Sequence, residues 1–235
     1  TAGSIVGVFA TGLFLLPFFG TRATLFGSAT LLGLLWAWSE VRRTRAFLLV
    51  AALTLIVVAT PLGALRASAT LIYERESPYQ YIRVEEIAGS RYLIFNEGNS
   101  PQSVWHPDTL ATGFYYDYIA TLPLFFSEAK PLKILLVGLG GGTIPTQYAT
   151  LYQNRAYTID AVEIDPAVVD TAQRFFHLPK EHLTLAIADG RTFLAASKKQ
   201  YDIIILDAFA QQYYIPWHLT TKEFFTIVRA HLAPQ

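Results

Sequence analysis

Three long runs without a charged residue open the sequence and restrict what this part of the chain can form. They span residues 1–21, 23–39 and 46–65. Each is close to the ~17–25 residues that an apolar helix needs to cross the hydrocarbon core of a membrane. Buried helices of soluble proteins rarely lack charge over such lengths, and a secretory signal peptide would have a single apolar core. We therefore predict three transmembrane helices within residues 1–66, with the lipid bilayer as a partner.

Charge is divided unevenly along the chain. The first 70 residues carry five basic residues and one acidic residue, a net +4, and the whole chain is neutral, so the remainder carries −4. An acidic remainder without a basic stripe argues against a nucleic-acid partner. Basic residues lie almost equally on both sides of the predicted helices, so they assign no side of the membrane to the remainder. Gly3 and Gly7 form a GxxxG pair, which allows association with other membrane subunits or with a second copy.

Residues 79–105 alternate between apolar and polar side chains and contain turn residues at 88–90 and 97–99. This pattern predicts two or three antiparallel strands, in a small β subdomain over residues 71–110. Residues 113–126 then show helical spacing of apolar side chains, with Pro123 near the end of the predicted helix.

Strands and helices alternate from residue 133 onward. The strands are apolar throughout, as expected for a parallel sheet that is covered on both faces. We therefore predict a doubly wound α/β, Rossmann-like domain over residues 111–235. The chain stops at a point where another strand is expected, so we expect this domain to be truncated at its C-terminus. The predicted strands are 133–137, 157–164, 183–188 and 202–206, and the predicted helices are 143–151, 166–176, 191–197 and 220–230.

The carboxyl ends of the predicted parallel strands carry the residue types of a nucleotide site. The first strand is followed by Gly138, Gly140 and Gly142, which allow a tight turn and close approach of a ligand to the backbone. A helix N-terminus with free N–H groups follows.

Acidic residues end the other three strands. Glu163 follows the glycines by roughly 20 residues, which suits a carboxylate that accepts hydrogen bonds from ribose hydroxyls. Asp189 can accept a hydrogen bond from an adenine amino group, and Asp207 ends the fourth strand. The alternative is a glycine turn among solvated acids.

Other ligand classes fit this pattern less well. No Lys-Ser or Lys-Thr follows the glycines, so the loop is not a Walker loop. The glycine count leaves NAD open, whereas the Asp-Gly after the third strand favours an S-adenosylmethionine-type ligand. The chain has no cysteine, and its histidines form no ligand cluster, so we predict no metal site and interpret His218 as structural.

Eight motifs follow one another along the chain. In order, they are SPYQYIRVEE, RYLIF, PQS, ILLVGLGGGT, AVEIDPAVVDTAQRFF, IADGRTFL, YDIIILDAF and LTTKEFF. Together they resemble one enzyme family, the spermidine synthases, or polyamine aminopropyltransferases. More closely, the chain resembles the bacterial membrane-fused, spermidine-synthase-like proteins, and the resemblance covers residues 71–234. It implies a protein of a bacterial inner membrane that binds decarboxylated S-adenosylmethionine, or S-adenosylmethionine, as co-substrate and transfers an aminopropyl group to an amine.

The resemblance also implies residue roles. Asp207 matches the base that takes a proton from the attacking amine. Glu163 and Asp189 match the acids on the ribose and adenine sides, and Gln102 matches a glutamine of the small sheet by a looser alignment. The glycine loop matches at Gly138 and Gly140.

The chain departs from the family where the amines are held. The loop lacks the family's aspartate, Ala210 stands at the position of the second acid, and the family's Tyr-His pair reads Tyr116-Asp117. Buried amine cations need carboxylate partners, because an unpaired buried charge costs several kcal/mol. Two functions therefore stay open about equally: a membrane-anchored aminopropyltransferase, or a catalytically degenerate pseudoenzyme that serves as a scaffold or accessory subunit of a membrane complex. A transporter or sensor is a third alternative, although three helices are too few to form a transport path alone.

Two further roles stay open from the sequence. Asp117 either replaces a missing acid or lies on the surface of an amphipathic helix. Tyr213, Tyr214 and Trp217 form an aromatic lid over the site, or they pack against a membrane or a partner.

Overall fold

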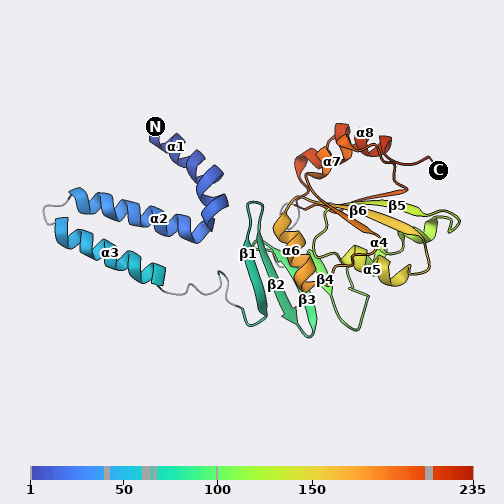
Figure 1. Cartoon of the computed structure of the whole chain (residues 1–235), viewed down its shortest axis with the longest axis horizontal. Coiled ribbons are helices and arrows are strands. Elements are labelled where there is room, and N and C mark those ends of the chain that lie inside the picture. Colours follow the sequence, from blue (N-terminus) through green and yellow to red (C-terminus); the bar gives the residue numbers. More distant parts are fainter. Residues whose placement is uncertain are drawn as a thin grey trace. The chain divides into compact units, whose positions relative to one another are not determined.

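The chain divides into two compact units, which are described separately here. The computed structural model describes residues 2–39, 43–59, 65, 68–98, 100–209 and 214–234. The first unit comprises Thr1–Ala67 with Glu76–Pro78, and the second comprises Ser68–Arg75 with Tyr79–Gln235 (Figure 1).

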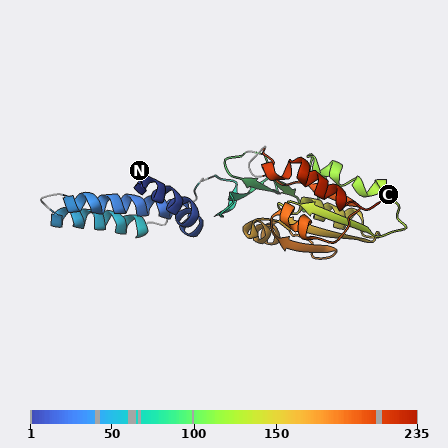
Figure 2. The same ribbon diagram turned by 90° about the horizontal axis from the view of Figure 1, so that it is seen from above.

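The first unit is helical. Helices α2 and α3 run side by side in both ribbon views (Figures 1 and 2). At Gly33 the absence of a side chain lets Val50 approach, since a Cβ atom built on Gly33 would lie 3.2 Å from Val50 Cγ2. Thr30 Oγ1 and Thr54 Oγ1 are 3.3 Å apart across the same contact. The elements are α1 (Ala2–Ala10), the π-helical turn η1 (Thr11–Leu15), α2 (Leu16–Ser39) and α3 (Arg43–Ala59).

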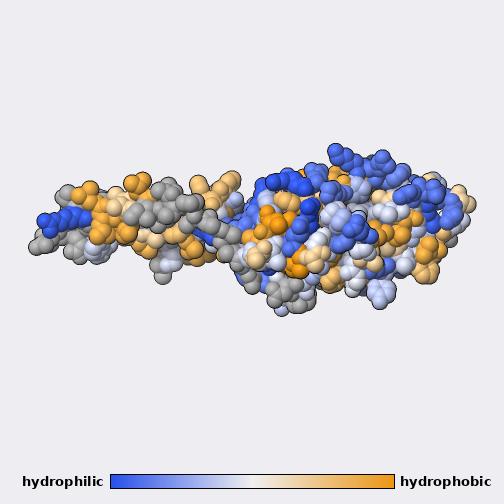
Figure 3. Space-filling view, turned by 90° about the horizontal axis from the view of Figure 1, so that it is seen from below, coloured by the Kyte–Doolittle hydropathy of each residue, from blue (hydrophilic) through white to orange (hydrophobic). Residues whose placement is uncertain are grey.

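The prediction of three membrane-spanning helices is wrong for the described residues, where one helix, Ala2–Trp36, is long and apolar enough to cross a membrane. The predicted division at Arg22 is absent because a single arginine does not interrupt a helix. The chain instead kinks at Gly20, where φ is 77°. Helix α3 has 17 described residues, and residues 60–64 of the predicted third helix lie outside the described part. Apolar colour prevails over the described atoms of this unit (Figure 3).

The second unit begins with the predicted antiparallel sheet, which the structure confirms with four strands in the order β1-β2-β3-β4. Strands β2 and β3 are joined by a two-residue turn at Ala88 and Gly89, both with positive φ. One side of this sheet packs against α6. The strands are β1 (Leu71–Glu76), β2 (Tyr81–Ile87), β3 (Ser90–Phe95) and β4 (Ser103–Trp105).

The parallel sheet confirms the predicted Rossmann-like fold. Its strand order is β7-β6-β5-β8, so the chain reverses direction across the sheet at β5, and the switch point lies between β5 and β8. Helices α5 and α6 pack on one face, and α7 and α8 pack on the other. The elements are β5 (Leu132–Val137), α5 (Thr143–Leu151), β6 (Tyr157–Glu163), α6 (Pro166–Phe175), β7 (Leu183–Ile187), α7 (Gly190–Ala196), β8 (Ile203–Leu206) and α8 (Lys222–Ala230).

The helix predicted over residues 113–126 is broken in the structure. It consists of one α turn, α4 (Tyr116–Ile119), and a separate 3₁₀ turn, η2 (Leu122–Phe125). Pro123 has no N–H to donate to the carbonyl of Ile119, so the α-helix cannot continue through it.

Candidate functional site

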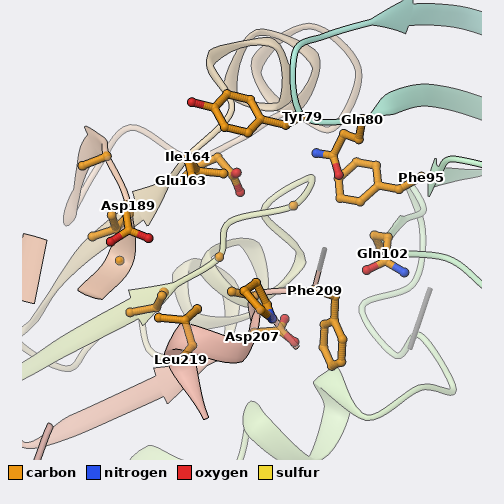
Figure 4. Close-up of a pocket in the computed structure, with 18 of the residues that line it drawn as sticks. Tyr79, Gln80, Phe95, Gln102, Glu163, Ile164, Asp189, Asp207, Phe209 and Leu219 are labelled. Carbon is orange, nitrogen blue, oxygen red and sulfur yellow. The ribbon is translucent and has the colours of Figure 1, made fainter. Parts of the chain in front are cut away.

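A cavity of about 270 Å³ opens at the carboxyl ends of the parallel strands. The ends of all four strands contribute to its wall, and the opposite wall comes from the antiparallel sheet through Gln80, Phe95 and Gln102 (Figure 4). Six of the seven predicted site residues line it. The exception is Gly142, which precedes α5 with φ of 84° and packs on Leu178. The six are Gln102, Gly138, Gly140, Glu163, Asp189 and Asp207.

The glycine loop is packed backbone against backbone. Gly138 has φ of 93°, and a Cβ atom there would lie 2.3 Å from the carbonyl oxygen of Asp207. At Gly140, with φ of 55°, a Cβ atom would lie 2.8 Å from the carbonyl oxygen of Gln102. The N–H of Gly141 donates to Ser103 Oγ at 2.7 Å. Glycine at 138 and 140 thus lets the loop contact both sheets and form the cavity floor.

Glu163 is buried, with 8% of its surface exposed. Its Oε2 accepts from the N–H of Leu139 at 3.0 Å, and its Oε1 accepts from the N–H of Asp165 at 3.1 Å. Burial raises the pKa of this carboxyl group, and hydrogen bonds from backbone N–H groups oppose the rise. The carboxylate is therefore fixed in direction next to the glycine loop.

Asp189 caps the N-terminus of α7. Its Oδ1 accepts from both the N–H and the hydroxyl of Thr192, each at 2.8 Å. Its Oδ2 lies 2.8 Å from His218 Nε2, on the 3₁₀ turn η3 (Trp217–Leu219). Burial alone would raise the pKa of Asp189, but these hydrogen bonds outweigh it and lower the pKa.

His218 is a site residue that sequence reasoning missed. We interpreted it as structural because no second metal ligand stands near it in the sequence, yet it lines the cavity and contacts Asp189. The two residues are 29 positions apart, and only the packing of η3 beside α7 brings them together.

Asp207 follows β8 in a different setting. Its Oδ1 accepts a hydrogen bond from the hydroxyl of Tyr115 at 2.7 Å. Burial raises the pKa of Asp207 to about 6, and the Tyr115 hydrogen bond only partly opposes this. The phenol that contacts Asp207 belongs to Tyr115 and not to Tyr116, the position suggested by the family pair. The Tyr116 hydroxyl donates to the carbonyl oxygen of Pro101 at 3.2 Å.

The remaining candidates lie elsewhere. Asp117 accepts hydrogen bonds from Thr112, Gly113 and Gln147, so it closes a loop and does not line the cavity. Tyr214 and Trp217 are exposed and do not line it either. Ala210 and Tyr213 lie outside the described residues.

The charge of the cavity indicates the ligand class that it can hold. Among the described lining residues there are three carboxylates, Glu163, Asp189 and Asp207, and no lysine or arginine. Such a wall suits hydroxyl and amino donors and a positive charge, and it disfavours the pyrophosphate of a dinucleotide. In the described part of the chain no three His, Cys, Asp or Glu side chains are grouped to hold a metal ion.

Comparison with known proteins matches this geometry. A family model described as the spermine/spermidine synthase domain matches residues 113–235. A probable polyamine aminopropyl transferase of Bifidobacterium longum is 37% identical over 164 residues, which cover 70% of this chain and 35% of that protein. The polyamine aminopropyltransferase of Vibrio vulnificus is 40% identical over 162 residues, which cover 66% of this chain and 53% of that protein. The chain thus spans about a third and about half of the lengths of these relatives.

Solved structures show the same fold. A probable spermidine synthase from Corynebacterium glutamicum aligns with a TM-score of 0.60 at 23% identity, covering 72% of this chain and 62% of that one. A spermidine synthase in complex with the transition-state analogue AdoDATO aligns with a TM-score of 0.56 at 21% identity, covering 69% of this chain and 55% of that one. Because the domain match extends over more than half of the sequence, the chain belongs to the spermine/spermidine synthase family.

Proposed function

We propose that the cavity binds decarboxylated S-adenosylmethionine and that the protein transfers its aminopropyl group to an amine. The observation that carries this proposal is the set of three carboxylates at the carboxyl ends of β6, β7 and β8, in a wall whose described residues include no basic side chain of lysine or arginine. The AdoDATO complex of a spermidine synthase with this fold supports an adenosyl ligand.

The nucleoside would lie between the glycine loop and the ends of β6 and β7. Glu163 is held by backbone N–H groups and has lone pairs left for two ribose hydroxyls. Asp189 stays charged and accepts from the amino group of the base. Gly140 lets the loop pack against Gln102 and Ser103, so that its backbone forms this side of the cavity.

Asp207 is suited to act as the base of the transfer. A carboxyl group with a pKa of about 6 is mostly ionised at neutral pH and still accepts a proton readily. As the amine nitrogen bonds to the propyl carbon, the bond from that carbon to sulfur breaks and its electron pair goes to sulfur. The nitrogen loses a proton to Asp207, and methylthioadenosine leaves. Tyr115 orients the carboxylate from the other side.

The apolar helix Ala2–Trp36 supports membrane anchoring of this activity, by its length and composition alone. Many of its large apolar side chains are exposed within its own unit, as at Val8 and Phe18. Alkaline carbonate extraction of membranes that carry the full chain tests this. Retention in the pellet is expected, and release into the supernatant would contradict anchoring.

Calorimetric titration of the detergent-purified full chain tests the binding site. The ligands are decarboxylated S-adenosylmethionine, S-adenosylmethionine and methylthioadenosine. Glu163→Gln is compared with Asp160→Asn, because both acids are buried in β6, but Asp160 contacts Lys199 and Tyr201 and does not line the cavity.

We expect micromolar binding that Glu163→Gln weakens by about tenfold or more and Asp160→Asn leaves unchanged, because a lost hydrogen bond to a charged group has about that effect. Binding of none of the three ligands would overturn the proposal. That result would favour the alternative, a catalytically degenerate scaffold or accessory subunit of a membrane complex.

A further inference from the structure

The contact between His218 and Asp189 has a consequence for the ligand. A carboxylate offers about four lone-pair sites. On Asp189, two sites of Oδ1 are used by the N–H and the hydroxyl of Thr192, both at 2.8 Å. One site of Oδ2 is used by His218 Nε2, also at 2.8 Å. One lone pair of Oδ2 remains for a ligand.

His218 is held in place independently of this contact. Its carbonyl oxygen accepts a hydrogen bond from Arg191 Nη1 at 3.0 Å, and Arg191 also donates to Thr221 Oγ1 at 3.2 Å. Arg191 lies in the first turn of α7, and Thr221 caps α8, so η3 is tied to both helices. The imidazole thus approaches Asp189 from a fixed direction and lines the cavity beside it.

The donors from Thr192 and His218 fix the orientation of the Asp189 carboxylate and leave one lone pair free. A carboxylate in this state discriminates between an amino group and an oxo group on a bound purine. An N–H of a 6-amino purine completes the set of hydrogen bonds. The oxygen of a 6-oxo purine would face a charged oxygen, and two acceptors placed opposite each other form no hydrogen bond. Thr192 binds only Oδ1, so His218 is the residue that fixes Oδ2.

We propose that His218 is a positioning residue that sets the nucleobase selectivity of the cavity, by directing the single free lone pair of Asp189 toward the amino group of an adenine. This inference rests on the proposed adenosyl-binding function. Its basis is the fixed geometry of η3 against α7, together with the position of both side chains in the cavity wall.

Titration of the full chain with two nucleosides tests the inference. The probes are methylthioadenosine and its 6-oxo counterpart, methylthioinosine. The variants are His218→Leu, which removes the donor, and His218→Gln, which supplies an amide N–H of similar reach. His231→Leu is the structural control, because that imidazole lies within hydrogen-bond distance of the carbonyl oxygens of Ile227 and Ser197 and does not line the cavity.

The wild-type protein is expected to prefer methylthioadenosine. His218→Leu should weaken methylthioadenosine binding by about tenfold and leave methylthioinosine binding unchanged, so that the ratio of the two affinities falls. His218→Gln should restore most of the ratio, and His231→Leu should keep the wild-type ratio even where the protein is less stable.

Other results would overturn the inference. An unchanged ratio in His218→Leu, or an equal fall of the ratio in His231→Leu, would assign His218 a structural role only, while wild-type binding of methylthioadenosine would still support the proposed function. Binding of neither nucleoside by the wild type would overturn both.

Discussion

Asp189 follows β7 and Asp207 follows β8, at opposite edges of the parallel sheet, and both line the same cavity. Their surroundings shift their pKa values in opposite directions. Asp189 has three hydrogen-bond donors within 2.8 Å and a lowered pKa. Within the described part of the chain, Asp207 has one such donor, Tyr115, and burial raises its pKa to about 6. Burial acts against the charge of both. Burial, which is the largest cause of the shift at Asp207, and the number of donors together decide which carboxylate stays charged and which can exchange a proton.

The local sequence explains this difference. Asp189 is followed by Gly190 and a helix, so the free N–H groups of the first turn are available to its side chain. Asp207 is followed by Ala208 and Phe209, which belong to no helix and donate no hydrogen bond to it. Pairs of acids with opposite pKa shifts are typical of sites that separate binding from proton transfer.

The largest expected effect, on the rate of transfer, comes from replacing Asp207, the proposed proton acceptor. Asp207→Asn should lower kcat for aminopropyl transfer by about 10²–10⁴-fold, the usual contribution of a general base, and leave methylthioadenosine affinity nearly unchanged. Steady-state kinetics and calorimetry on the same preparation check this. A variant that loses affinity and keeps kcat would reverse the roles assigned to the two ends of the cavity.

The next effect concerns how Asp207 is placed. Gly138→Ala combines a left-handed backbone with a Cβ atom 2.3 Å from the Asp207 carbonyl oxygen. Gly113→Ala is the matched control, with φ of 75° and open space around the added atom. We expect a loss of about 3 kcal/mol in the free energy of unfolding for Gly138→Ala and about 1 kcal/mol for Gly113→Ala. Equal losses in denaturant unfolding would show that the close approach is not required.

The fold followed from the sequence because its signals are local. Four apolar strands, each followed by a helical pattern, predicted the parallel sheet, and the observed strand Tyr157–Glu163 differs from the predicted 157–164 by one residue. The acids at the strand ends reached the cavity for the same reason, since the carboxyl ends of parallel strands meet at one edge.

The missed features depend on contacts between distant residues. Tyr115 and Asp207 are 92 positions apart, and no spacing in the sequence could choose Tyr115 over Tyr116. Gly142 reads like its neighbours Gly138 and Gly140, and only its contact with Leu178 separates it from them. In the first unit, the sequence predicts a helix boundary at Arg22, but a single charge does not end a helix. The structure instead places a kink at Gly20, where the backbone leaves the helical conformation.

A smaller effect is expected on stability. Burial raises the pKa of Asp207 to about 6 in the folded protein, well above its ordinary value of about 3.9 in the unfolded chain. The folded protein therefore binds more protons than the unfolded chain in this range, and its stability falls as pH rises from about 4 through 6. The Asp207→Asn variant carries no titrating group at this position, so its stability lacks this dependence on pH. Between pH 5 and 7.5 the wild type should lose about 1 kcal/mol relative to the variant, or roughly 2–4 °C in Tm. Thermal unfolding of both proteins at both pH values checks the sign. A wild-type Tm that rises relative to that of Asp207→Asn as pH increases would contradict the raised pKa of Asp207.

The smallest effect comes from removing the hydroxyl of Tyr115, which donates a hydrogen bond to Asp207. Tyr115→Phe keeps the ring that packs on Tyr116, with ring centroids 4.2 Å apart, and removes the hydroxyl that lowers the pKa of Asp207. The acidic limb of the kcat/KM profile, expected at about pH 6 in the wild type, should therefore move to higher pH, while the rate on the alkaline plateau changes little. Tyr148→Phe is the control, because that buried hydroxyl donates to the carbonyl oxygen of Ile119 at 2.9 Å, away from the cavity. If the limb moved to lower pH instead, the phenol would be disfavouring the charged carboxylate, and donor number could not explain the contrast between Asp207 and Asp189.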